Sequence, residues 1–219
     1  MYVCWLLLLV NVFSFRSLTK SEIKPVLINQ FDLPHAGFST LLRLQTSNST
    51  SWTFVISCFN AIPETTDYVY SVPNIEKQLT TKITPVFLTN RITWPNGIVP
   101  ADPLVSNSII VPSGFLVPGK TKGNLNYIDN NEPIALVPNE ITHWFYHDAT
   151  FKDMNNDGYI DILAGRANVP ILGKPQSQLI WLKNPGETDI TGPWELHFLM
   201  QQNGPDIDVQ FAKIDGTEV

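Results

Sequence analysis

Charged residues are scarce in this sequence, and basic residues are the scarcer kind. Only 16% of the 219 residues are charged, and 14 Lys and Arg against 20 Asp and Glu leave a net charge of −6. A nucleic-acid-binding surface needs clustered basic side chains to displace the counterions of the phosphates, and no such cluster occurs here. We therefore expect no nucleic acid among the partners of this protein.

Long hydrophobic runs are also missing, apart from one near the N-terminus. Residues 4–13 are apolar except for Asn11. A core of about ten apolar residues is too short to span a bilayer and matches the hydrophobic core of a secretory signal peptide. The sequence therefore predicts a signal peptide over residues 1–17, a secreted, extracellular protein and no membrane span. A buried N-terminal strand is the alternative for this segment.

Cysteine is nearly absent, with two residues in the chain. Cys4 would be removed with the signal peptide, so the remaining Cys58 cannot form a disulfide within the mature chain. Because it lies in the apolar run WTFVISCF, we expect a buried, unreactive thiol; pairing with a cysteine outside this chain is the alternative. The sequon Asn48-Ser49-Thr50 lies in a polar run and predicts a glycan on Asn48 of the exported protein.

Helical periodicity is absent as well. The 17 prolines and 12 glycines are spread along the chain, and they bound short segments rich in β-branched and aromatic residues, which are typical of strands. The sequence therefore predicts an all-β fold. The predicted strands are Trp52–Phe59, Tyr68–Val72, Ile83–Leu88, Ser108–Val111, Gly114–Val117, Leu125–Ile128, Ile141–Tyr146, Tyr159–Leu163, Gln178–Leu182, Trp194–Leu199 and Asp208–Ala212.

An internal repeat refines this prediction. Gly114–Lys120 followed by Asn124–Asp129 has a counterpart in Asp161–Arg166 followed by Gln178–Asn184. Each unit is an apolar strand, a glycine with a basic residue, a loop, and a strand with a central aromatic residue. The glycines that precede the two basic residues are 46 positions apart. A period near 50 in an all-β chain is typical of propeller blades, each a four-stranded sheet.

Two further copies bear on the number of blades. A weaker one covers Trp52–Ser57 and Tyr68–Val72, and another begins at Trp194. The chain thus has room for three to four blades of about 50 residues, whereas closed propellers have roughly four to eight. The sequence predicts an incomplete β-propeller over residues 51–219, preceded by a polar segment with the first strands over residues 18–50.

The stretch FKDMNNDGYIDIL at residues 151–163 carries the one motif with evident chemistry. Side-chain oxygens occupy loop positions 1, 3, 5 and 9, a glycine follows position 5, and position 7 can offer a backbone carbonyl. This spacing lets a tight loop wrap a hard cation with several oxygens, and three carboxylates balance its charge. Ca²⁺ fits such a loop better than Mg²⁺, which requires a rigid octahedron and retains several waters. The candidate metal ligands are Asp153, Asn155, Asp157, the carbonyl of Tyr159, and Asp161.

Two other structures can contain an Asp- and Asn-rich stretch of this kind, an EF-hand and a plain hairpin turn. The EF-hand is excluded because position 12 is Ala164, where a bidentate glutamate is required, and because the flanking segments are strand-like. A hairpin turn without a metal is the alternative, since Asn and Asp readily form turns.

The motif resembles the FG-GAP/VCBS type of calcium-loop repeat found in integrin-α-like propellers. The resemblance rests on Phe151, two residues before the first aspartate, and on the D-x-N-x-D-G-x-x-D-I pattern that follows; it is clear only over residues 141–219. It implies a structural Ca²⁺ site within a repeat at about residues 141–190. A degenerate or truncated repeat over residues 194–219 keeps Asp208, Phe211 and Asp215-Gly216 but lacks the first carboxylates, so we expect poor metal binding there.

Histidines and tryptophans are further candidates for a site. His143 and His147 lie in the strand-like run ITHWFYHD, where four residues span about 13 Å, too far for one zinc ion to bind both imidazoles. No motif of nucleophilic catalysis or phosphate binding occurs. Tryptophans could stack on sugars, but we expect them in the core between blades; they are Trp52, Trp94, Trp144, Trp181 and Trp194.

These observations lead to a hypothesis about function. The resemblance implies a secreted, calcium-stabilised β-propeller that acts as an extracellular binding or adhesion module for a protein or glycan. The alternative is an extracellular propeller enzyme, a hydrolase or lyase, whose catalytic residues would lie beyond Val219. A propeller fragment without activity of its own is a third interpretation.

Overall fold

The computed structural model shows a chain built from strands and loops. Its described part contains a single helix, α1 (Ile75–Gln78), and no helix there is long and apolar enough to cross a membrane. Apart from Val3–Cys4, the predicted signal peptide lies outside the described residues, as does the predicted glycosylation site Asn48. The structure describes residues 3–4, 26–45, 49–62, 65–186, 190–205, 207–211, 213–214 and 217–218.

The first sheet is a four-stranded antiparallel meander. It consists of β3 (Ala36–Gln45), β4 (Thr50–Cys58), β5 (Tyr68–Val72) and β6 (Val86–Thr89), and each strand pairs with the next one in the chain. A short strand, β2 (Phe31–Asp32), precedes it and pairs with β1 at Val3–Cys4.

The second sheet repeats this arrangement with shorter strands. They are β7 (Val99–Pro100), β8 (Ile109–Pro112), β9 (Leu125–Asp129) and β10 (Glu132–Ala135), again paired in chain order. The turn between β9 and β10 contains Asn130 and Asn131, both with positive φ. Asparagine tolerates this backbone region better than most residues, which explains the tight turn.

The third sheet has five strands but is only four strands wide. Both β11 (Phe145–Tyr146) and β12 (Thr150–Lys152) pair with β13 (Asp161–Asn168), each at a different end of it. β14 (Gln176–Lys183) and β15 (Glu195–Met200) complete the meander. A last two-stranded pair joins β16 and β17, whose bounds are Lys213–Ile214 and Thr217–Glu218.

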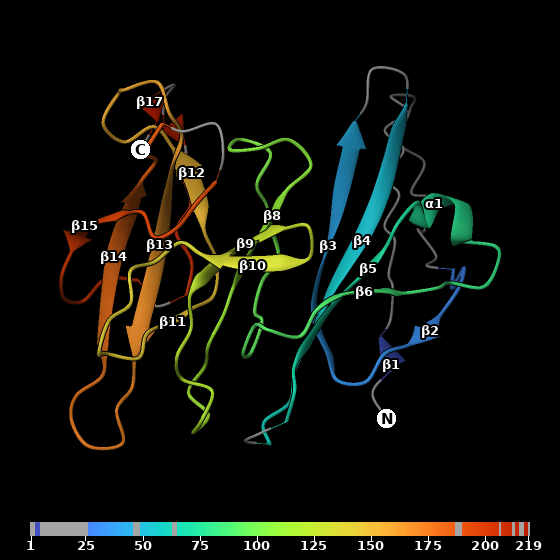
Figure 1. Ribbon diagram of the computed structural model, residues 1–219, viewed down its shortest axis with the longest axis horizontal. Coiled ribbons are helices and arrows are strands. Elements are labelled where there is room, and N and C mark those ends of the chain that lie inside the picture. The colour runs from blue at the N-terminus through green and yellow to red at the C-terminus, as the bar shows by residue number, and fades with distance from the viewer. Residues whose placement is uncertain are drawn as a thin grey trace, which may run out of the picture.

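The three sheets stand side by side in chain order, with the third at the left of Figure 1, the second in the centre and the first at the right. Strand β8 shows how they pack. Ile109 and Val111 belong to a buried cluster with Val55 and Val69 of the first sheet, whereas Ile110 belongs to the cluster shared with the third sheet. Alternate side chains point to opposite faces of a strand, so the second sheet is covered on both faces.

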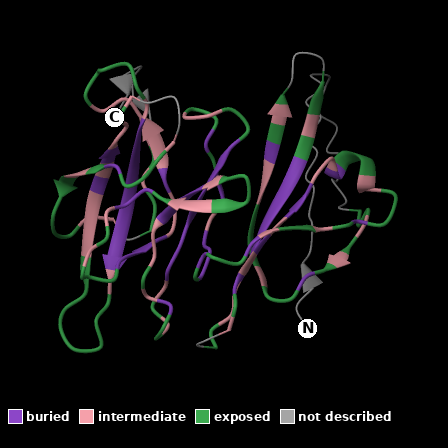
Figure 2. Ribbon diagram, in the orientation of Figure 1, coloured by how far each residue is buried: buried purple, intermediate pink, exposed green. Residues whose placement is uncertain are grey.

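The outer face of the first sheet is covered by local structure. Ile56 and Cys58 of β4 are buried against Leu33, Ile75 of α1 and Ile83. The expected burial of Cys58 is thus confirmed. In the third sheet, β13 is buried along most of its length (Figure 2).

The prediction of an all-β fold is confirmed, but several predicted strands are wrong. Gly114–Val117 lies in a turn, where Gly114 has a φ of 85° and Phe115 N–H donates to the carbonyl of Lys120. Of Ile141–Tyr146, only the last two residues form a strand, and Asp208–Phe211 forms none.

The predicted repeat matches the sheets in part. The hairpins β4–β5, β8–β9 and β13–β14 are the second and third strands of successive sheets, as the repeated strand pairs suggested. The first half of the alignment is shifted, because the strand before Lys120 is Ile109–Pro112 and not Gly114–Val117. Trp194 precedes β15, which pairs with β14 as the last strand of the third sheet and does not start another sheet.

Candidate functional site

The candidate metal loop, residues 153–161, connects β12 to β13. Lys152 pairs with Asp161 at the base of this hairpin, so the ends of the loop lie close together. Asn156 and Gly158 have positive φ values of 59° and 91°. These are residue types that adopt the left-handed region most readily, and they let the chain turn sharply between the aspartates.

The first three candidate ligands are brought together inside this turn. Asp153 accepts hydrogen bonds from the N–H of Gly158 at 2.9 Å and from the N–H of Asp157 at 3.2 Å. The Asn155 Oδ1 atom accepts from the same Asp157 N–H at 3.1 Å, and its Nδ2 atom donates to Asp157 Oδ2 at 2.8 Å. The side chains at positions 1, 3 and 5 are therefore linked in one hydrogen-bond network around the N–H of Asp157.

Asp157 is held in its charged form by this arrangement. The N–H of Tyr159 donates to Asp157 Oδ1 at 3.0 Å. This hydrogen bond, together with that from the Asn155 amide, holds the pKa of the Asp157 carboxyl below its usual range, because both donors stabilise the anion. Lys183 of β14 adds a positive charge nearby, with its Nζ atom 4.0 Å from Asp157 Oδ2.

Asp161 is placed differently, because it is buried at the start of β13. Its Oδ2 atom accepts from the N–H of Met154 at 2.9 Å, and its Oδ1 atom accepts from the N–H of Asn184 at 2.8 Å. The Asn184 side chain in turn donates to the carbonyl of Ile160 at 2.9 Å. Asp161 therefore ties the loop to the end of β14, and each of its oxygens keeps a further lone pair.

The donor set of the loop fits calcium in its chemistry. It offers carboxylate and amide oxygens, the ligands that Ca²⁺ prefers, in the order that the sequence predicted. In the described part of the chain, however, no three His, Cys, Asp or Glu side chains form a group that could hold a metal ion. The structure brings together Asp153, Asn155 and Asp157, and it leaves both oxygens of Asp161 on backbone amides.

The two histidines have separate surroundings. His143 is exposed and its Nδ1 atom lies 3.1 Å from Thr121 Oγ1. The His147 ring packs edge-on against Phe38 and Phe115, with ring centroids 5.3 and 6.4 Å away. The two histidines thus contact different parts of the chain.

Three of the five tryptophans named as candidates are buried, as expected. They are Trp94, Trp144 and Trp194. Trp52 is instead exposed, and Trp181 is half-buried and stacks on His197 of the neighbouring strand, with ring centroids 4.3 Å apart.

Sequence reasoning missed that the basic residues of the repeat are buried. Lys120 lies between the first and second sheets, and its Nζ atom is 2.6 Å from Asp67 Oδ1. Arg166 lies on the face of the third sheet that packs on the second, with its guanidinium 4.3 Å from the centroid of the Trp144 ring. A glycine before each basic residue was the only local signal, and it does not indicate burial.

Arg166 is the centre of a polar row that crosses three strands. Its cross-strand neighbours are Tyr146 on β11 and Gln178 on β14. The guanidinium donates to the Tyr146 hydroxyl at 3.1 Å and to Gln178 Oε1 at 2.8 Å. It also forms an ion pair with Glu140 at 3.0 Å. Each nitrogen of the guanidinium thus has a side-chain partner, as a buried charged group requires.

This row predicts a loss of stability at alkaline pH. Burial raises the pKa of Tyr146 to about 12, although the charge of Arg166 opposes that shift. Because the folded protein holds this proton more tightly than the unfolded chain, the contribution to stability is complete below pH 10 and is lost as the pH rises toward about 12. Urea unfolding at successive pH values should show a shallower decline for Tyr146→Phe than for the unsubstituted protein. Equal slopes would contradict the prediction.

No protein-family model, curated protein or solved structure gives a significant match to this chain. Its function is therefore inferred from the sheets, the loop and the polar groups.

Proposed function

We propose that this protein is a secreted, calcium-stabilised β-propeller that serves as an extracellular binding or adhesion module for a protein or glycan. One observation carries the proposal. Three antiparallel meanders, each four strands wide, follow one another in the chain and pack face to face. A propeller blade is such a meander, and it buries its faces only against its neighbours.

The spacing of the sheets supports the same proposal. Their second strands begin at Thr50, Ile109 and Asp161, which places them 59 and 52 residues apart. The second separation is close to the length of one propeller blade of about 40–50 residues, and the first is somewhat longer. The second sheet contributes one face to each neighbour, as an internal blade would.

In this proposal the calcium ion is structural. Asp153, Asn155, Asp157, Asp161 and the carbonyl of Tyr159 would hold it. When bound, the ion supplies positive charge that offsets the repulsion among three carboxylates. The residues of the chain orient the oxygens: the N–H groups of Asp157 and Gly158 fix Asp153. An ion bound only by the native state stabilises that state.

The binding role rests on fold analogy. Propellers present their connecting loops at the ends of the strands, and function resides in such loops more than in the blades themselves. No catalytic motif in the sequence favours an enzyme, so we assign the chain a binding function.

Calcium binding is testable at the loop. The full chain should bind one Ca²⁺ with a dissociation constant of about 10⁻⁴ to 10⁻³ M, as extracellular calcium modules do. Asp157→Ala should abolish this binding in calorimetric titrations because it removes the carboxylate at position 5. Asp129→Ala is the matched control, since Asp129 also lies beside a hairpin turn but in the second sheet. Equal binding by both variants would place the ion elsewhere.

The binding role is tested on cell surfaces. Fluorescently labelled full chain should bind to fixed cells in Ca²⁺ and detach in chelator, because the ion supports the fold. Prior treatment of the cells with protease or with glycosidases separates a protein ligand from a glycan. Absence of any binding in Ca²⁺ would contradict the proposed function.

A further inference from the structure

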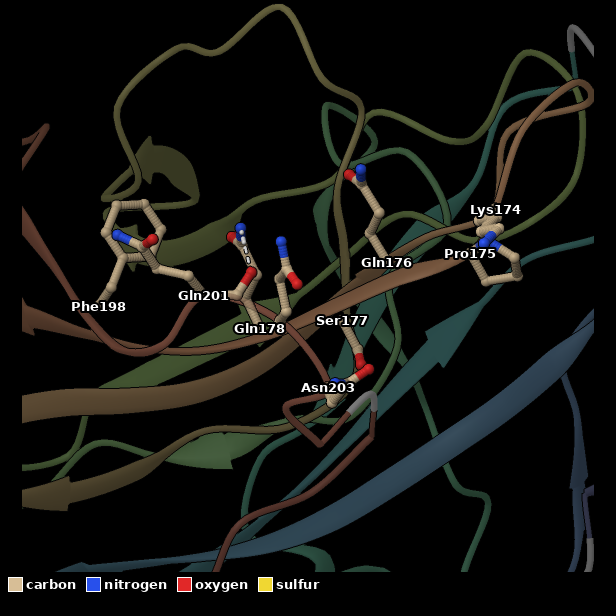
Figure 3. A pocket seen from close by; sticks show the side chains of 9 residues that line it. Lys174, Pro175, Gln176, Ser177, Gln178, Phe198, Gln201 and Asn203 are labelled. Carbon is tan, nitrogen blue, oxygen red and sulfur yellow. Dashed lines mark hydrogen bonds between the residues drawn. The ribbon is translucent and has the colours of Figure 1, made fainter.

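A hollow of about 740 Å³ lies at one end of the third sheet, beside the polar row of Arg166. It is bounded by the start of β14, the end of β15 and the residues that follow β15. In Figure 3, Gln176 and Gln178 extend from β14 toward the same side, as residues two apart on a strand do. This volume is within the range of small-ligand sites.

Side-chain amides dominate the lining of this hollow. Each amide carries an acceptor oxygen and two donor hydrogens, so it can match a hydroxyl group, which both donates and accepts. Among the described residues that line the hollow, none is acidic and one, Lys174, is basic. The amides belong to Gln176, Gln178, Gln201, Gln202 and Asn203.

An aromatic face lies among these amides. Phe198 of β15 is 43% exposed, and the Arg166 guanidinium lies 5.7 Å from its ring centroid. The C–H face of a sugar ring packs on an exposed aromatic ring because both faces are apolar. The hydroxyl groups at the edge of the sugar then lie beside the surrounding polar groups. An exposed phenyl ring among amides is the combination that such a ligand needs.

One of the amides is fixed in orientation before any ligand binds. Gln178 Oε1 accepts from Arg166 Nε at 2.8 Å, and Gln178 Nε2 donates to the carbonyl of Gln201 at 3.2 Å, the dashed line in Figure 3. Arg166 is buried and is itself held by Tyr146 and Glu140. Its position is therefore fixed, and it keeps the Gln178 amide in one orientation. The second hydrogen of Gln178 Nε2 stays available, so part of the ordering cost of binding is already met.

We infer that this hollow is a binding site for a neutral glycan. The inference rests on the proposed function and specifies the ligand class and the place where it binds. Neutral sugars fit because the lining offers uncharged donors and acceptors and an aromatic ring. An acidic glycan would depend on Lys174, an exposed side chain. A peptide would need apolar subsites, and Phe198 is the one aromatic residue among the described residues of the lining.

The test uses the full chain and soluble oligosaccharides. Maltohexaose, cellohexaose, mannopentaose and chitohexaose serve as neutral probes, and a heparin hexasaccharide serves as the acidic probe. Binding is measured by saturation-transfer NMR and titration. We expect at least one neutral probe to bind. Phe198→Ala and Gln202→Ala should each weaken that binding about tenfold, the effect of losing one ring contact or hydrogen-bond partner.

The control is Phe87→Ala. Phe87 is 48% exposed, similar to Phe198, but lies on β6 of the first sheet. It should leave neutral-probe binding unchanged, and all three variants should keep the calcium response.

Each other outcome overturns the inference. If no neutral probe binds, or if binding withstands Phe198→Ala and Gln202→Ala, the hollow is not the site. Binding of heparin alone, abolished by Lys174→Gln, would assign an acidic ligand instead. Binding to cells that is removed by protease and not by glycosidases would assign a protein ligand. In each of these cases, an intact calcium response and calcium-dependent cell binding would leave the proposed function standing.

Discussion

Lys120→Met is expected to lower the free energy of unfolding by about 3–5 kcal/mol, because removing one partner of a buried ion pair leaves the other charge uncompensated. Lys120 and Asp67 are each 2% exposed. The ammonium lies 2.6 and 2.8 Å from the two oxygens of the Asp67 carboxylate. This loss of free energy would be a large part of the total stability of a typical domain.

The surroundings of Asp67 explain why its charge would remain buried. The N–H of Trp94 also donates to Asp67 Oδ2 at 2.8 Å. Lys120 additionally donates to the carbonyl of Thr65 at 3.1 Å. With methionine in place of Lys120, the carboxylate keeps one strong donor and no cation.

The matched control is the exposed ion pair between Arg91 and Glu132. Glu132→Gln removes one partner there, and the expected loss is below about 1 kcal/mol because water solvates the remaining charge. Urea unfolding of both variants provides the comparison. Equal losses in the two variants would show that the Lys120 pair is not buried as described.

Ile110→Ala is expected to cost about 2–5 kcal/mol, the range for truncating a fully buried aliphatic side chain. Ile110 is 0% exposed, and it belongs to the cluster that joins the second sheet to the third through Ile162 and Ile180. The loss combines the burial of three carbon atoms with the cavity that remains between two sheets.

Ile141→Ala is the control, since the same side chain is 100% exposed there. We expect a change within about 0.5 kcal/mol, as for most surface substitutions. Thermal and urea unfolding of the two variants test whether the sheets pack face to face. A small effect of Ile110→Ala would contradict that packing.

The sequence predicted the strands that are buried on one or both faces. Trp52–Phe59 and Leu125–Ile128 correspond to β4 and β9, because buried strands carry dense β-branched and aromatic residues. The bounds of β3 were not predicted within the segment 18–50 that was expected to hold the first strands, because Ala36–Gln45 has one buried residue, Leu42. Its formation depends on pairing with β4, which a local pattern cannot show.

The same distinction explains the candidate site. The hydrogen bonds that gather Asp153, Asn155 and Asp157 are local, so the spacing of the motif was enough to predict their convergence. The contact from Asn184 to Asp161 spans 23 residues, and that between Lys120 and Asp67 spans 53. The first contact arises only when β13 and β14 pair, and the second only when the first and second sheets pack together. No local pattern in the sequence indicates either contact.

The most direct test of the proposed calcium stabilisation is a thermal melt of the full chain in chelator, in Ca²⁺ and in Mg²⁺. We expect Ca²⁺ to raise the melting temperature above that in chelator, because an ion bound by the folded state stabilises it. Mg²⁺ should raise it less, and Asp157→Ala should abolish the rise. A melting temperature that is the same in all three solutions, and unchanged by Asp157→Ala, would contradict the account and leave residues 153–161 an ordinary hairpin turn.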